Sequence, residues 1–161
     1  VRNCAQLFQS DSESSRISWQ WQLSEEIPPC RMDKGQMEQV FINLLLNARD
    51  AIEEKWGDRE NGRIDKRIVL KTKFDRPFVV CAVCDTGKGV DRGIADKIFD
   101  PFFTTKEVGK GTGLGLSISY GIVQELGGVI SVRSGPDRGA CFVIQLPLKV
   151  ERNGTNPTAG G

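Results

Sequence analysis

One long amphipathic segment constrains the fold of this chain more than any other part of it. Between residue 33 and about residue 55, apolar side chains recur with the period of an α-helix. Asp33, followed by Gln36 three positions later, matches the two polar positions of a capping box, so the helix should begin there. The apolar positions form one broad face: Met37, Val40, Phe41, Leu44, Leu45, Ala48 and Ile52. Such a face is typical of a helix packed against a second layer.

The remaining segments predict that this second layer is a β-sheet. Alternating or apolar β-type runs occupy residues 16–23, 67–74, 78–84, 129–133 and 140–146, with hairpin turns expected at 75–77 and 135–137. Residues 91–99 predict a short helix, 100–115 a loop, and 114–126 a second long helix closed by Gly127 and Gly128. The predicted fold class is therefore α/β: a two-layer sandwich with a mixed, mostly antiparallel sheet and helices on one face.

The 161 residues suit a single domain. We expect residues 1–15 to be the tail of an upstream helix or linker, 16–149 the domain, and 150–161 a disordered tail. Because the chain begins at Val1 rather than Met, we expect it to be a piece of a longer protein.

Composition excludes several kinds of function. There is no histidine, which removes Ser-His-Asp triads, Cys-His pairs and every histidine-containing zinc site. A net charge of +1 argues against nucleic-acid binding, and no apolar run approaches the ~20 residues that span a bilayer. The five scattered cysteines indicate reduced, intracellular usage. Cys81 and Cys84 lie in one predicted strand and face opposite sides of it, which favours core packing over metal binding.

A polar ridge on the first helix is the strongest anomaly. It consists of Asn43, Asn47, Asp50 and Glu54, and its two asparagines sit four apart within a very apolar run. An asparagine oxygen is a neutral ligand suited to Mg²⁺ that also touches phosphates. The ridge is equally compatible with a solvated helix face, or with amides that satisfy buried backbone groups.

Asp85 follows an apolar strand and precedes Thr86, Gly87, Lys88 and Gly89. The two glycines allow a sharp turn and a close backbone approach to a ligand, and the carboxylate can accept a hydrogen bond from an exocyclic amine such as that of adenine. The alternative is an Asx turn that ends the strand without a ligand.

A glycine-rich run, residues 109–115, leads into the second long helix. Its glycines and the helix N-terminus are suited to binding an anion, and Lys106, Lys110 and Thr112 are nearby cation and donor candidates. The spacing matches neither a Walker P-loop nor a Rossmann fingerprint. The three aromatics in residues 99–106 favour a mobile lid or a plain hydrophobic plug.

Four motifs in this order resemble the catalytic and ATP-binding domain of bacterial sensor histidine kinases, in the superfamily that includes DNA gyrase and mismatch-repair ATPases. They are an asparagine box (residues 39–51), a first glycine box (85–89), a phenylalanine box (98–106) and a second glycine box (111–116). The resemblance covers about residues 16–148 and implies the Bergerat ATP-binding fold. The asparagine box and the short lid look most like the nitrogen-regulatory type of kinase.

The resemblance also implies residue roles. Asn47 would ligate an Mg²⁺ that bridges ATP phosphates, with Asn43 beside it. Asp85 would bind the adenine amine in a pocket shaped by Gly87 and Gly89. The lid hinge that closes on the triphosphate would be Gly111, Thr112, Gly113, Leu114 and Gly115, with Lys106 and Lys110 as candidate phosphate contacts. Asp50 stands where other histidine kinases have a basic residue and is not expected to bind phosphate.

Asn43 separates the functional classes that this superfamily contains. Gyrase-like ATPases place a glutamate there as general base, whereas an amide cannot take a proton at neutral pH. The resemblance thus implies a cytoplasmic protein-histidine kinase domain that passes the ATP γ-phosphoryl to a histidine on its own separate dimerisation domain, for relay to a response-regulator receiver domain. A non-catalytic nucleotide-binding or scaffold module and a gyrase-like ATP hydrolase are the alternatives. No contact with nucleic acid, and none of this segment with a membrane, is implied.

Overall fold

The computed structural model describes residues 16–28, 32–57, 64–107, 111–135 and 139–148. Five strands form one sheet in the order β1-β2-β3-β5-β4, and only the β1–β2 pair is parallel. The strands are β1 (Ser18–Leu23), β2 (Arg67–Asp75), β3 (Phe78–Asp85), β4 (Val129–Ser134) and β5 (Ala140–Pro147), and the helices are α2 (Lys34–Trp56) and α3 (Gly115–Glu125).

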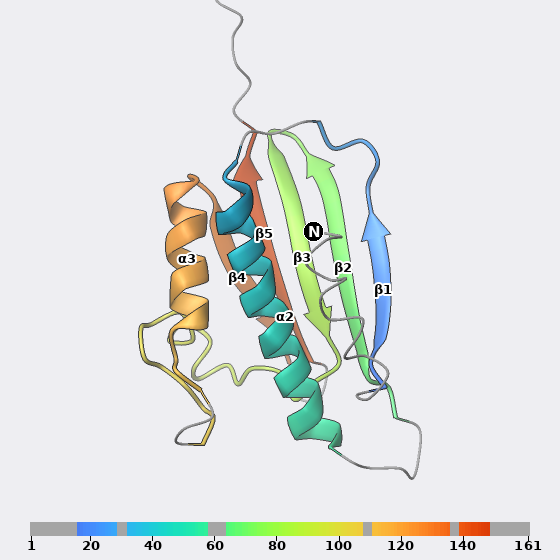
Figure 1. The fold of residues 1–161 in the computed structure, drawn as a ribbon, viewed down its shortest axis with the longest axis vertical. Helices are drawn as coiled ribbons and strands as arrows, with labels where there is room; N and C mark the ends of the chain where they lie inside the picture. Colours follow the sequence, from blue (N-terminus) through green and yellow to red (C-terminus); the bar gives the residue numbers. More distant parts are fainter. Residues whose placement is uncertain (1–15, 29–31, 58–63, 108–110, 136–138, 149–161) are drawn as a thin grey trace, which may run out of the picture.

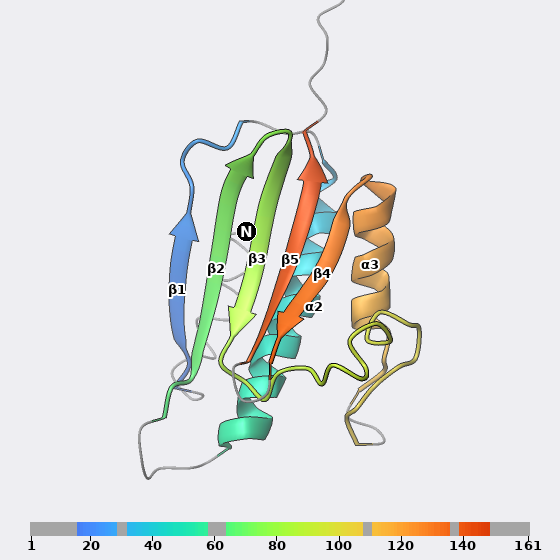
Figure 2. The same cartoon turned by 180° about the vertical axis from the view of Figure 1, so that it is seen from behind.

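Both helices lie on the same face of the sheet, as Figures 1 and 2 show from opposite sides. The predicted two-layer fold class is confirmed. The apolar stripe of α2 is buried at all seven predicted positions, and it meets alternate residues of the strands, for example Phe142, Ile144 and Leu146 of β5. Neither described helix is long and apolar enough to cross a bilayer.

One of the two hydrogen bonds of the predicted capping box forms at the start of α2. The Asp33 side chain accepts a hydrogen bond from the Gln36 backbone N–H at 2.8 Å. The Gln36 side chain does not return to Asp33 but donates to Glu125 of α3 at 3.4 Å. A partner from a distant segment therefore replaces the local one.

The prediction of a short helix over residues 91–99 is wrong. These residues form successive turns, with Ile94 N–H donating to the Asp91 carbonyl and Lys97 N–H to the Ile94 carbonyl. The Asp91 carboxylate accepts a hydrogen bond from Gly93 N–H at 2.6 Å. Gly93, a poor helix former, stands near the start of this segment, and most of the segment's backbone bonds join residues three apart, so no continuous α-helical ladder forms.

The prediction that all cysteines are reduced is also wrong, because a disulfide joins Cys84 and Cys141. They stand directly opposite each other on β3 and β5, 57 positions apart in sequence. Cys81 is buried on the opposite face of β3 and is not part of this disulfide, as its strand position predicted. Cys4 and Cys30, the expected tails at 1–15 and 150–161, and the centre of the turn at 135–137 lie outside the described residues.

Candidate functional site

A cavity of about 700 Å³ lies between α2, the end of β3, the segment after β3 and the start of α3. Nine predicted site residues line it: Asn43, Asn47, Asp85, Gly89, Lys106, Gly111, Thr112, Gly113 and Gly115. Gly87 and Leu114 are not among its lining residues, and Lys110 lies outside the described part of the chain. Segments far apart in sequence thus converge on one cavity. Its volume is large enough for a small-molecule ligand.

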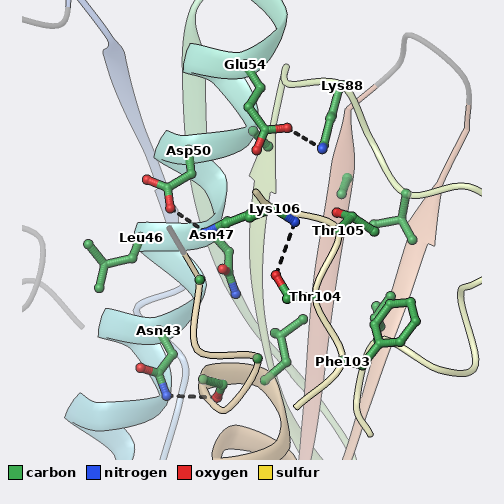
Figure 3. Close-up of a pocket in the computed structure, with 18 of the residues that line it drawn as sticks. Asn43, Leu46, Asn47, Asp50, Glu54, Lys88, Phe103, Thr104, Thr105 and Lys106 are labelled. Carbon is green, nitrogen blue, oxygen red and sulfur yellow. Dashed lines mark hydrogen bonds and ion pairs between the residues drawn. The ribbon is translucent and has the colours of Figure 1, made fainter. Parts of the chain in front are cut away.

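All four residues of the polar ridge on α2 face this cavity, so the ridge is not simply a solvated helix surface (Figure 3). Asp50 forms an ion pair with Lys106 across the cavity, with Nζ and Oδ2 2.5 Å apart, and Glu54 forms one with Lys88. Both lysines come from the segment between β3 and α3. The two ion pairs therefore connect that segment to α2 beside the cavity.

The two asparagines of the ridge differ in their hydrogen bonding. The Asn43 amide N–H₂ donates to the Gly115 carbonyl at 2.9 Å and to the Ser119 hydroxyl at 3.2 Å, while its oxygen accepts from Gln39. Ser119 is fully buried. Asn43 therefore ties the first turn of α3 to α2. Within the described residues the Asn47 side chain makes no hydrogen bond, so its amide is available to a ligand.

Asp85 ends β3 with its side chain turned to the helix-covered face, only 6% exposed. Its Oδ1 accepts hydrogen bonds from Gly87 N–H at 2.8 Å and from Ala140 N–H at 3.2 Å. Burial raises the pKa of Asp85 above its ordinary value, and the two backbone hydrogen bonds and the charge of Lys55 oppose this only in part. The Gly87 bond is the Asx turn that sequence reasoning offered as an alternative, but the same carboxylate also lines the cavity.

Two glycines are required by close backbone contacts around the cavity. A Cβ on Gly87 would lie 2.6 Å from the backbone carbon of Ala51 on α2. Gly113 has a φ of 66°, and a Cβ there would lie 2.5 Å from the backbone of Phe102, whose N–H donates to the Gly113 carbonyl at 3.0 Å. The phenylalanine box and the second glycine box are thus in direct backbone contact.

The apolar wall of the cavity contains residues that sequence reasoning did not assign to the site. They are Ile94, Ile98, Phe103 and Phe142, whereas Ala140, which also lines the cavity, lies at the position that the family resemblance places near the adenine. The β5 residues join the site because β5 pairs with β3 beside Asp85, and no local pattern specifies that pairing. The described residues contain no group of three or more histidine, cysteine or acidic side chains that could hold a metal ion by themselves.

Comparison with known proteins decides the family. A family model described as histidine kinase-, DNA gyrase B-, and HSP90-like ATPase matches residues 32–150. The chain belongs to this ATPase family. The family predicted from the four ordered motifs is thereby confirmed.

Sequence relatives of this ATPase domain include sensor kinases. It is 46% identical over 134 residues to the sensor kinase CckA of Brucella abortus, covering 76% of the chain and 14% of that relative. It is 33% identical over 152 residues to the sensor histidine kinase ZraS of Escherichia coli, covering 94% of the chain and 30% of ZraS. The chain therefore spans less than a third of the length of these relatives.

Solved structures agree with this family. The catalytic domain of the histidine kinase ThkA superimposes with a TM-score of 0.75 at 29% identity, over 91% of this chain and 90% of that one. Full-length ShkA in complex with AMPPNP matches with a TM-score of 0.76 at 26% identity, over 91% of this chain and 29% of that one. The structure of ThkA in complex with the response regulator protein TrrA matches with a TM-score of 0.71 at 26% identity, over 91% of this chain and 39% of that one.

Proposed function

We propose that this ATPase-family domain is the Mg-ATP-binding, phosphoryl-donating part of a two-component sensor histidine kinase. One observation carries the proposal: residues of all four motifs line a single cavity. The sensor-kinase relatives and the AMPPNP complex of ShkA support it. The expected cytoplasmic location stays a prediction.

The nucleobase end of the cavity would be formed by Asp85 and the apolar wall. Both described hydrogen bonds to Asp85 end on Oδ1, and the carboxylate also lines the cavity. We propose that Oδ2 accepts a hydrogen bond from the adenine amine, while Ile94, Ile98 and Phe142 pack against the purine. The backbone bonds from Gly87 and Ala140 would hold the carboxylate in this orientation.

The metal end would be formed by Asn47. Mg²⁺ keeps several waters and binds through few protein ligands plus substrate phosphates, which fits a single available amide in a cavity without an acidic cluster. When bound, Mg²⁺ supplies charge neutralisation on the phosphates. Asn47 would position that charge, and Asn43, whose amide is engaged by Gly115 and Ser119, would act by fixing the start of α3.

The phosphate end would be formed by the backbone of residues 111–115 at the N-terminus of α3. We propose Lys106 as a further phosphate contact, released from its ion pair with Asp50 when nucleotide enters. Lys110 and Leu114 stay candidates from the family resemblance alone.

Phosphoryl transfer would go to a histidine outside these 161 residues, which contain none. With an engaged amide at position 43, the cavity has no general base there to activate water, which disfavours the hydrolase alternative. A neutral imidazole on a separate dimerisation domain needs no such base. The complex of ThkA with TrrA supports a response-regulator receiver domain as the next partner.

Calorimetry with AMPPNP tests the first half of the proposal. We expect binding that is tighter in Mg²⁺ than in EDTA, and absence of binding at millimolar nucleotide would refute the proposal. The second half is tested by adding the domain to a phosphoacceptor domain with an intact histidine. Labelling of that domain, and none of the histidine-free chain itself, is expected. Tight binding without transfer would favour the non-catalytic module, and steady-state hydrolysis lost in Asn47→Ala would favour the hydrolase.

A further inference from the structure

The Cys84–Cys141 disulfide lies in a second cavity, on the face of the sheet opposite the helices. Cys84 stands between Val83 and Asp85, both of which turn to the helix-covered face, so strand alternation points Cys84 the other way. The cavity measures about 680 Å³ and is lined by both cysteines. Both cysteines are only half-buried, and both face a cavity wide enough to admit a small thiol.

Two arginines line the cavity of this disulfide, which Asp85 also lines. Arg133 of β4 stands directly opposite Cys141 of β5, so Cys84, Cys141 and Arg133 form a row across three neighbouring strands on one face. Arg92, from the segment after β3, lines the same cavity. A guanidinium next to a cysteine stabilises its thiolate, and two guanidinium groups attract anionic reagents.

The disulfide also connects the two strand ends that hold Asp85. Cys84 immediately precedes Asp85, and Cys141 immediately follows Ala140, whose N–H donates to Asp85 Oδ1. The backbones there are in close contact, since a Cβ on Gly139 would lie 1.9 Å from the Asp85 carbonyl oxygen. Reduction turns one S–S bond into two thiols, which must separate to nonbonded contact. Without this covalent tie, only noncovalent contacts hold the start of β5 beside Asp85.

We propose that Cys84–Cys141 is a thiol–disulfide exchange site for an anionic low-molecular-weight thiol, and that its oxidised form holds Asp85 in place for nucleotide binding. The second clause rests on the proposed function. The site is distinct from the nucleotide cavity, because the two sulfur atoms lie on the other face of the sheet.

The exchange proceeds in two steps. A thiolate attacks the Cys84 sulfur, the S–S bond breaks, and Cys141 leaves as a thiolate beside Arg133. A second thiol molecule attacks the mixed disulfide on Cys84 and releases the disulfide of the small thiol. Two small thiols are oxidised, the protein disulfide is reduced, and the two protons of the thiols end on Cys84 and Cys141.

The exchange site is tested by the rate of reduction of the oxidised chain, followed by mass spectrometry of the peptides that carry the two cysteines. Glutathione is the anionic probe and 2-mercaptoethanol the neutral one. In Arg133→Gln the glutathione rate should fall at least about threefold relative to the neutral thiol. Arg76→Gln, an exposed arginine at the β2–β3 turn, should change neither rate. The site would be overturned if the glutathione rate fell equally in Arg133→Gln and Arg76→Gln, or if mass spectrometry found no disulfide between the peptides that carry Cys84 and Cys141.

The coupling is tested by AMPPNP affinity in the oxidised and reduced states. Reduction should weaken binding about fivefold, the factor that corresponds to one hydrogen bond of ordinary net strength. The Cys84→Ser/Cys141→Ser double variant should bind like the reduced chain and ignore reductant, whereas Cys81→Ala should keep the response. Equal affinity in both states refutes the coupling. If the oxidised chain exchanges thiols but binds no nucleotide, the proposed function fails while the exchange site stands.

Discussion

Replacing Asp85 by asparagine should separate nucleotide recognition from fold stability. Asparagine has the same shape, and its Oδ1 can still accept the hydrogen bonds from Gly87 and Ala140. Because burial raises the pKa of Asp85, its ionised form costs free energy at neutral pH, and a neutral amide avoids that cost. The free energy of unfolding of Asp85→Asn should therefore equal or exceed that of the wild type.

The loss should appear in binding instead. At position 85 the carboxylate oxygen that we assign to the adenine amine becomes an N–H₂ donor, so two donors face each other. A hydrogen bond to a charged group contributes about 1.5–3 kcal/mol, which corresponds to about 10- to 150-fold in affinity. We expect this loss for an adenine nucleotide in calorimetry.

A matched ligand makes the test specific. An inosine nucleotide carries a carbonyl oxygen where adenine carries its amine, so it should bind the Asp85→Asn variant better than it binds the wild type. If the folded variant binds both nucleotides within about threefold of the wild type, Asp85 does not read the base, and the assignment of the nucleobase end is wrong.

Three further predictions follow from the same geometry. Asn47→Ala should weaken AMPPNP binding about 10- to 100-fold in Mg²⁺ but little in EDTA, and an equal loss in both buffers would contradict a metal-binding role. Gly87→Ala should lower the free energy of unfolding by about 1–3 kcal/mol because its Cβ would meet the backbone of α2. Gly121→Ala, with no atom within 4 Å of the added Cβ, should raise the free energy of unfolding by about 0.5–1 kcal/mol. Urea denaturation measures both variants, and equal effects would refute the close contact at residue 87. The raised pKa of Asp85 should favour the folded state in acid, with a contribution that is present below the unfolded pKa of 3.8 and is lost as pH rises through the folded pKa. The stability of the wild type relative to Asp85→Asn should therefore decline over that interval. A pH-independent difference between the two proteins in denaturation experiments would contradict the raised pKa.

Local sequence determined the elements of this protein and the chemistry of its motifs. Helical period and the Asp33 cap were sufficient to predict α2, because both depend on residues within one or two turns of each other. Strand alternation likewise predicted all five strands to within two residues at either end. The same reasoning failed over 91–99, where the backbone bonds mostly join residues three apart and form turns instead of a helix.

Only the tertiary structure decided how those motifs meet. Sheet order places β5 beside β3, which brings Ala140 to Asp85 and joins Cys84 to Cys141. Packing of α3 on α2 gives the Asn43 amide its partners across more than seventy residues. Periodicity reports which face of an element is buried, but it does not report which distant element covers that face. The contacts that complete the site are nonlocal, and the chain makes them only when its layers pack together.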